Sequence, residues 1–258
     1  MSLNGKPRCK HMKKEDKELI YDLLKKTDAY VTGYTSQTFA VPMSFEDDGE
    51  LDQQMEKTVV PEPVEGPTTN DALTLDNLKS KILRCTKCQL ARTRNNVVPG
   101  EGVEHPDVLV IGEGPGYDED MSGRPFLGKA GVLLDKMLAA IGLDRNTNCY
   151  IANVVKCRPP NNRDPEPAEQ SACSGFLEAQ IHILKPKMIL CMGRIAGHKM
   201  LDSQSPLNQL RGQFHDYNGI PLMVTYHPSA LLRDQALKAP AWEDLKAFRR
   251  RLNEITGQ

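Results

Sequence analysis

Four of the seven cysteines fall in a pattern that could bind a metal. Cys85 and Cys88 form a C-x-x-C pair, Cys157 lies in the segment KCRPP, and Cys173 follows 16 positions later. Four thiolates can hold either a tetrahedral zinc ion or a [4Fe–4S] cluster, and the spacing alone does not separate the two. The segment between Cys157 and Cys173 is rich in Pro and Asn and has little to pack with. A metal anchor is therefore favoured over incidental burial of these two cysteines.

The other three cysteines fit simpler roles. Cys149 and Cys191 lie inside apolar segments and are expected to be buried core residues, whereas Cys9 stands alone and indicates nothing. The first residues carry no apolar signal region, and no run of about 18 apolar residues occurs. We therefore expect a cytoplasmic protein that does not bind membranes, in which the cysteines do not form a disulfide framework.

A loop rich in glycine and proline follows the first apolar segment of the chain. Its sequence GEGPG supplies five candidate ligand contacts, namely Gly112, Glu113, Gly114, Pro115 and Gly116. Glycines let the backbone approach a ligand closely because they have no side chain. The spacing is not the G-x-G-x-x-G of dinucleotide sites, and the acidic run that follows, which includes Glu119, would repel a pyrophosphate.

Two further side chains could hold a planar ligand. Phe126 lies in GRPFLGKAG, where flanking Gly and Pro make it a poor core candidate and a good stacking platform. The alternative is that Phe126 anchors its loop to the core. Asn153 follows a predicted strand, and its amide can donate and accept hydrogen bonds along one edge of a base, or else cap a turn.

His227 opens the segment HPSALLR near the carboxyl end of the chain. The proline that follows holds His227 on a stiff turn, which suits a functional imidazole better than a surface one. Leu231 and Leu232 are expected to project from a short loop beside Arg233. Apolar side chains at a loop tip can wedge into a base stack, although the same residues could form the first turn of a packed helix.

The elements that must position these residues alternate between strand and helix. Apolar runs predict buried strands over 107–112, 149–155, 187–193 and 221–226. Helical periodicity predicts helices over 74–84, 129–142, 167–184 and 240–255. This alternation predicts an α/β fold with a mostly parallel sheet and helices on both faces. Ligands of such sheets bind beyond the carboxyl ends of the strands, where every motif except the C-x-x-C pair falls.

Residues 1–74 form an extension before the α/β domain, which is expected over 75–258. The extension has a helical pattern over 10–30 and an acidic, Pro-rich stretch over 42–72, which we interpret as a disordered linker. Residues 1–75 carry 9 Lys and Arg against 14 Asp and Glu, and the remainder carries a net charge of +4. The mildly basic body suits a nucleic-acid partner, and the sequence names no partner for the extension.

Together these motifs resemble the family-4 uracil-DNA glycosylases. The matching segments are C-x-x-C at 85–88, GEGPGxxED at 112–120, GRPFLGKAG at 123–131, NVVKCRPPNNRDP at 153–165, Cys173, and HPSALLR at 227–233. The resemblance covers about residues 75–255. It implies a three-layer α/β/α sandwich around a short, mostly parallel four-stranded sheet. It also implies a structural [4Fe–4S] cluster with the ligands Cys85, Cys88, Cys157 and Cys173.

The resemblance further implies an activity on DNA that contains uracil. A monomeric enzyme of this family hydrolyses the N-glycosidic bond of deoxyuridine in single- or double-stranded DNA and leaves an abasic site after extruding the nucleotide. Phe126 would stack on the extruded ring, and Asn153 would read its edge and reject cytosine. His227, in its neutral form, would donate a hydrogen bond to the developing uracil anion, with backbone N–H groups of the 112–116 loop assisting.

The remaining roles implied by the family concern charge and DNA. An acidic side chain would stabilise the sugar cation or position water, and Glu113 and Glu119 both match the family pattern. Leu231 would fill the gap left by the extruded base, and Arg233 would lie near a phosphate.

Two functions of other classes stay open. One is an iron–sulfur DNA-binding protein without base-excision activity, which the set of Glu113, Asn153 and His227 disfavours. The other is a zinc-bearing nucleotide hydrolase, which would need a phosphate cradle or a catalytic metal with an open position. The sequence contains neither a Walker loop nor a His/Asp cluster.

Overall fold

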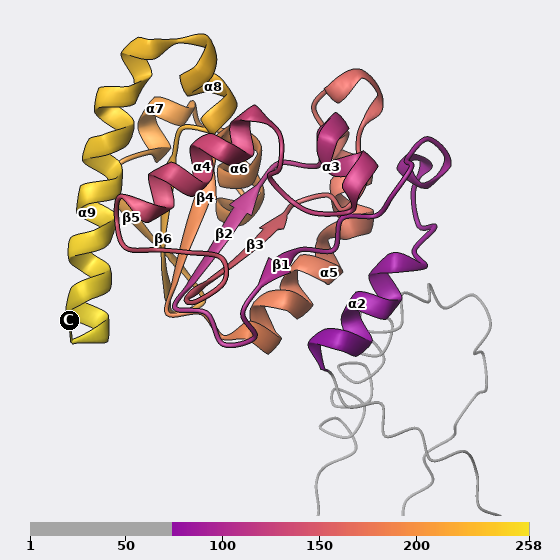
Figure 1. Ribbon diagram of the computed structural model, residues 1–258, viewed down its shortest axis with the longest axis horizontal. Coiled ribbons are helices and arrows are strands. Elements are labelled where there is room, and N and C mark those ends of the chain that lie inside the picture. The colour runs from indigo at the N-terminus through magenta and orange to yellow at the C-terminus, as the bar shows by residue number, and fades with distance from the viewer. Residues whose placement is uncertain (1–73, 258) are drawn as a thin grey trace, which may run out of the picture. The chain divides into compact units, whose positions relative to one another are not determined.

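A computed structural model of the chain describes residues 74–257 (Figure 1). Its strands are β1 Glu101–Gly102, β2 Val108–Gly112, β3 Cys149–Asn153, β4 Met188–Met192, β5 Phe214–Tyr217 and β6 Ile220–Thr225. Its helices are α2 Leu75–Leu83, α3 Tyr117–Ser122, α4 Lys129–Ala139, α5 Pro167–Leu184, α6 Arg194–Leu201, α7 Leu207–Leu210, α8 Pro228–Arg233 and α9 Lys238–Thr256. Short 3₁₀ turns lie at Gln89–Arg92, Pro160–Asn162 and Gln235–Leu237. The predicted helix over 10–30 and linker over 42–72 lie outside the described residues.

The described strands form one sheet in the order β1-β3-β2-β4-β6-β5. The four central strands are parallel and are the four that the apolar runs predict. The prediction of a four-stranded sheet is incomplete at both edges, where β1 and β5 pair antiparallel to their neighbours. These strands escaped prediction because β1 has two residues and β5 alternates exposed and half-buried side chains, so neither contains an apolar run.

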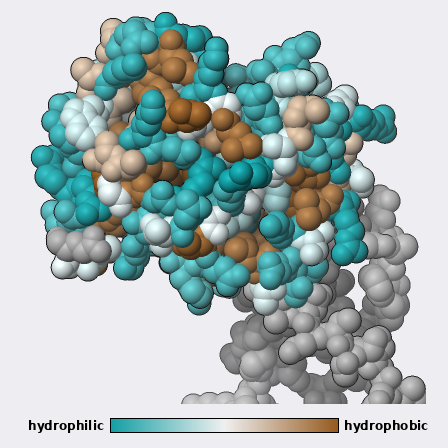
Figure 2. Space-filling view, viewed as in Figure 1, coloured by the Kyte–Doolittle hydropathy of each residue, from teal (hydrophilic) through white to brown (hydrophobic). Residues whose placement is uncertain are grey.

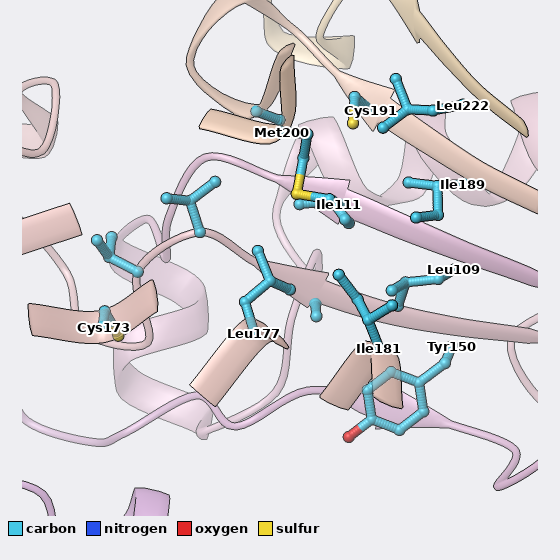
Figure 3. Close-up of a cluster of buried hydrophobic side chains, with 14 of the residues drawn as sticks. Leu109, Ile111, Tyr150, Cys173, Leu177, Ile181, Ile189, Cys191, Met200 and Leu222 are labelled. Atoms are coloured by element: carbon cyan, nitrogen blue, oxygen red, sulfur yellow. The ribbon is translucent and has the colours of Figure 1, made fainter. Parts of the chain in front are cut away.

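Helices cover both faces of the sheet, which confirms the α/β/α sandwich (Figure 1). On one face, α5 directs Leu177 and Ile181 into a core cluster with side chains of β2, β3, β4 and β6 (Figure 3). On the other face, Leu138 of α4 and Phe248 of α9 pack in a second cluster. Every residue of β2, β3 and β4 is buried, as expected for parallel strands covered on both sides.

The sheet has a topological switch point between β2 and β4. Helix α4, which follows β2, and helix α6, which follows β4, contribute to the clusters on opposite faces. Loops that leave neighbouring strands toward opposite faces open a crevice beyond the carboxyl ends of those strands. The loops after β2, β3, β4 and β6 all begin at this end of the sheet.

The two cysteines predicted to be core residues are confirmed as such. Cys149 and Cys191 are completely buried in β3 and β4. On the face shown in Figure 2, hydrophobic surface is divided into patches among hydrophilic residues. Within residues 74–257, no helix has the length and apolar character needed to cross a bilayer.

Candidate active site

A cavity of about 600 Å³ lies beyond the carboxyl ends of the parallel strands. Each of the four strand-end loops contributes to its lining, through Glu113 after β2, Asn153 of β3, Gly193 after β4 and His227 after β6. Further residues singled out by the sequence also line it, namely Gly114, Pro115, Gly116, Glu119, Phe126 and Arg233. The cavity has the volume of a small-molecule pocket and combines aromatic with polar side chains.

One wall of the cavity depends on a glycine at the end of β2. A Cβ atom at Gly112 would overlap Oδ1 of Asn153 and lie 2.6 Å from Cζ of Phe126. Phe126 is 6% exposed and belongs to the core, so the expectation that it is a poor core residue is wrong. Its ring nevertheless borders the cavity, with its centroid 5.6 Å from that of His227. Phe126 therefore anchors its loop and presents an aromatic surface to a ligand.

Asn153 carries an unsatisfied polar atom into this wall. The residue is 2% exposed, and Oδ1 has no hydrogen-bond partner among the described residues. Leaving a buried amide oxygen without a donor costs about 1–3 kcal/mol. A ligand that offers an N–H group at this position would recover that free energy, so the orphaned oxygen points to a donor-bearing ligand.

The backbone of Asn153 is held by a buried lysine that sequence reasoning missed. Nζ of Lys156 donates to the carbonyl oxygen of Asn153 at 2.8 Å and to Oε1 of Gln180 at 2.7 Å. Gln180 in turn donates to the carbonyl of Pro99 at 2.7 Å. Lys156 is 1% exposed. A lysine is ordinarily a surface residue, so only the three-dimensional contacts identify this anchor.

His227 is fixed in one tautomer by its own turn. It caps the amino end of α8, and its Nδ1 accepts a hydrogen bond from the backbone N–H of Ser229 at 3.2 Å. The hydroxyl of Ser229 also lies 2.8 Å from Nδ1. Because Nδ1 accepts, the neutral ring carries its proton on Nε2, which is then a donor. Burial, with the positive charge of Arg233, lowers the pKa of His227 to about 4, so the ring is neutral at pH 7.

The close approach of the β4 and β6 loops requires a second glycine. Gly193 has a φ of +88°, and a Cβ atom there would lie 2.9 Å from Cβ of His227. Sequence reasoning missed Gly193 and Ser229 as site residues. Both carry a signal that could have identified them: a glycine directly after a buried strand, and a serine two positions after a histidine that precedes proline.

The structure separates the two glutamates that the sequence left equivalent. The carboxylate of Glu119 accepts three backbone hydrogen bonds, from Gly116 at 3.0 Å, Leu127 at 2.8 Å and Gly128 at 3.1 Å. Glu119 therefore ties the glycine loop to the loop of Phe126. It also occupies the N–H group of Gly116, which is then unavailable to a ligand.

Glu113 lines the cavity as Glu119 does, but no described residue donates a hydrogen bond to its carboxylate. Burial, together with the negative charge of Asp164, raises the pKa of Glu113 to about 7, against the opposing charges of Arg194 and Arg233. A carboxyl group held near neutrality in a cavity is characteristic of catalytic acids and bases.

The HPSALLR segment forms a helix and not a projecting loop. Leu231 is 2% exposed and packs in the core, so the expectation that it projects toward a ligand is wrong. Leu232 is 42% exposed and lies next to the exposed Arg233. The helical turn of α8 directs successive side chains to different faces, which is why only one of the two leucines faces solvent.

Cys85, Cys88, Cys157 and Cys173 come together around a second cavity, which shares no lining residue with the first. All four are free thiols. Within residues 74–257, no group of three or more His, Cys, Asp or Glu side chains could hold a metal ion. Four cysteine thiols around one cavity could hold either a zinc ion or an iron–sulfur cluster.

Donors and cations around these cysteines favour bound thiolates. Nη1 of Arg94 donates to Sγ of Cys157 at 3.1 Å, and the buried Lys156 also lines this cavity. Burial raises the pKa of Cys173 to about 11, so a thiolate there requires a cationic partner. Hydrogen bonds to sulfur of this kind tune iron–sulfur centres.

Comparison with known proteins identifies relatives over the same region. Residues 99–246 match the family model described as the Uracil DNA glycosylase superfamily. A Type-4 uracil-DNA glycosylase of Archaeoglobus fulgidus is 38% identical over 192 residues, which cover 71% of this chain and 94% of the relative. Type-4 uracil-DNA glycosylases of Sulfurisphaera tokodaii and Thermotoga maritima are each 42% identical, over 68% and 67% of this chain and 83% and 91% of their own lengths.

Proposed function

The chain belongs to the uracil-DNA glycosylase superfamily, and from this membership we propose how its site releases uracil from DNA by hydrolysing the N-glycosidic bond. The observation that carries the proposal is the pair formed by the orphaned Oδ1 of Asn153 and the neutral His227 on one cavity. A pyrimidine bound there can meet an acceptor at Asn153 and a donor at His227. The substrate is uracil in DNA, extruded from its base stack or taken from a single strand.

Asn153 supplies the discrimination between bases. Uracil offers an N3–H donor and an O4 acceptor, and cytosine offers an acceptor and a donor at the same two positions. The buried Oδ1 of Asn153 accepts N3–H, and its amide nitrogen donates to O4. With cytosine, two acceptors would face each other at N3 and two donors at the exocyclic amine. Buried polar groups left unpaired in this way reject a ligand strongly. Phe126 contributes a ring surface on which the extruded base stacks.

His227 and Glu113 act on the charges that develop when the glycosidic bond breaks. The departing uracil becomes anionic, and Nε2–H of His227 donates a hydrogen bond to it. The sugar becomes cationic, and the carboxylate of Glu113 stabilises it or orients the attacking water. Glu119 ties the glycine loop that contains Glu113 to the loop of Phe126 through its three backbone hydrogen bonds and is a positioning residue.

The rate of uracil release is expected to follow the ionisation of Glu113. Since its pKa is about 7, the carboxylate form dominates above that pH and is lost below it. We expect kcat/KM to be level above about pH 8 and to fall by up to about tenfold per pH unit below 7. Measurement of kcat/KM between pH 5 and 9 checks this, and Glu113→Gln should give a low, flat profile. The same pH dependence in Glu113→Gln would assign the titrating group elsewhere.

DNA contacts are proposed at the rim of the cavity. Because Leu231 is buried, we assign to the exposed Leu232 the role of entering the gap left by the extruded base. Arg233 lines the cavity, and its positive charge would bind the phosphate next to the extruded nucleotide. Arg194 also lines it and pairs with Asp164 at 2.5 Å.

The four-cysteine cavity is proposed to hold a [4Fe–4S] cluster with Cys85, Cys88, Cys157 and Cys173 as ligands. When bound, the cluster supplies a structural crosslink and no step of base release. Support comes from its cavity, which is separate from that of Asn153 and His227. The crosslink joins the end of α2 to α5 and to the segment after β3, and so fixes the loop that begins at Arg158.

Loss of one ligand is expected to remove the cluster and lower stability together. Cys157→Ala should abolish bound iron and sulfide, remove the visible absorbance, and lower the melting temperature. Iron and zinc analysis of anaerobically purified protein checks this. Cys149→Ala is the matched control, because Cys149 is also buried but lies outside the four-cysteine cavity, and this variant should retain its iron. Full iron content in Cys157→Ala, or zinc in the wild type, would contradict the proposed ligand set or cofactor.

We propose that the protein works as a monomer in the cytoplasm. The six described cysteines are free, and four of them must remain reduced to bind a cluster.

Base release distinguishes this function from that of a DNA-binding protein. Oligonucleotides that carry a single uracil, cytosine or thymine are incubated with the protein and then treated with alkali, which cleaves at abasic sites. We expect cleavage of the uracil strand alone. Tight binding without alkali-sensitive sites in any strand would favour the iron–sulfur DNA-binding alternative.

A further inference from the structure

An exposed aromatic side chain lies at the edge of the uracil cavity without a role in the reaction described above. Tyr117 is the first residue of α3, is 57% exposed, and lines the same cavity as Asn153 and His227. The guanidinium carbon of Arg158 lies 5.1 Å from the centroid of its ring. This distance is within the range of a cation–π contact.

Hydrogen bonds near Tyr117 and on Arg158 restrict the movement of both side chains. Glu119 fixes the turn that precedes Tyr117 by accepting the N–H of Gly116. Arg158 follows Cys157 directly, and its Nε donates to Oδ1 of Asn162 at 2.8 Å. The pair therefore presents a preorganised planar surface at the cavity edge, and little conformational entropy is lost when a ligand binds it.

The size of the cavity leaves room for more than the extruded base. A volume of about 600 Å³ is that of a pocket for a drug-sized ligand, which exceeds what one pyrimidine ring requires. When a nucleotide leaves a base stack, the neighbouring base loses a stacking partner. Aromatic and guanidinium side chains replace that partner in proteins that bind single strands, and they do so without reading sequence.

We propose that Tyr117 and Arg158 form a stacking subsite for the nucleobase next to the extruded uracil. This subsite rests on the proposed function, because it needs a DNA strand whose uracil occupies the cavity. It recognises a planar base of any identity, since neither side chain is arranged to read a base edge. Arg158 adds a positive charge beside the strand's backbone.

A purely structural role for the pair makes a different prediction. If Tyr117 and Arg158 only fasten the loop after β3 to α3, removal of the ring would weaken every substrate by the same factor. If they bind a neighbouring base, the effect of removing the ring must vanish when that base is missing. Deleting the base from the DNA and the ring from the protein therefore forms a double-mutant cycle.

The experiment uses single-stranded oligonucleotides that carry one uracil and either all bases or a tetrahydrofuran residue at the 5′ or the 3′ neighbour. Equilibrium binding by fluorescence anisotropy and single-turnover uracil release are measured for the wild type, Tyr117→Ala and Tyr117→Phe. Phe214→Ala is the matched control, because Phe214 is 41% exposed on β5 and does not line the cavity.

With all bases present, we expect Tyr117→Ala to weaken binding by about 5-fold to 100-fold, and Tyr117→Phe and Phe214→Ala to resemble the wild type. When the neighbour that stacks on Tyr117 is replaced by tetrahydrofuran, binding by the wild type should weaken by the same factor that Tyr117→Ala loses on DNA with all bases. On that substrate Tyr117→Ala should bind as tightly as the wild type. An equal loss on all three substrates, or no loss on any, would overturn the subsite. Failure of the proposed function would appear separately, as binding without uracil release by the wild type.

Discussion

His227→Ala is expected to slow uracil release at saturating DNA by about 10²-fold to 10³-fold, the effect of removing one preorganised donor from a developing anion. The structure holds the ring neutral and directs its proton to Nε2 through the two contacts of Nδ1 with Ser229. Because the hydrogen bond strengthens as charge develops on uracil, kcat should fall much more than affinity for DNA. Single-turnover rates and binding constants measured in parallel check both expectations.

Two further variants, one outside the His227 loop and one within it, sharpen this result. His215→Ala is a matched control, because His215 lies on the edge strand β5 and contacts the carbonyl of Leu210. It should release uracil at the wild-type rate. Ser229→Ala removes the hydroxyl contact but leaves the backbone N–H that holds Nδ1, so a smaller loss is expected. A wild-type rate in His227→Ala would exclude the imidazole from the reaction.

Asn153→Asp is expected to lower uracil release by about 10²-fold or more and to make cytosine release measurable. The substitution removes the amide donor to O4 of uracil and places a carboxyl oxygen there, which can accept from the exocyclic amine of cytosine. Parallel assays on uracil and cytosine oligonucleotides give the selectivity ratio. Asn153→Ala is the control, since it removes both contacts and should lose uracil release without gaining activity on cytosine. Unchanged activity and selectivity in Asn153→Asp would remove Asn153 from base recognition.

The central strands were predictable because burial on both faces leaves a continuous apolar run, as in β2 and β4. The edge strands were not: β1 consists of two residues, one of them a glycine, and so contains no apolar run. The segment 228–233 was predicted as a loop in one interpretation and a packed helix in the other. Only tertiary packing decides which of two adjacent leucines is buried, so the sequence could not separate Leu231 from Leu232.

The same limit applies to the candidate site. Asn153 and His227 could be identified because each follows a strand, and strand ends of a parallel sheet converge. The roles of Glu113 and Glu119 could not be distinguished, because the difference lies in the backbone hydrogen bonds that Glu119 accepts from two separate loops. Lys156 gave no signal, since its role depends on the distant Gln180. Residues that act through long-range contacts are those that sequence patterns leave undetermined.

Single-turnover release of free uracil from a labelled oligonucleotide with one uracil tests whether this cavity catalyses base release. EDTA is present, and the wild type is measured beside His227→Ala. We predict release by the wild type and a loss of about 10²-fold or more in the variant. A folded, iron-containing wild type that binds the DNA but releases no uracil from single or double strands would show that the cavity does not catalyse base release.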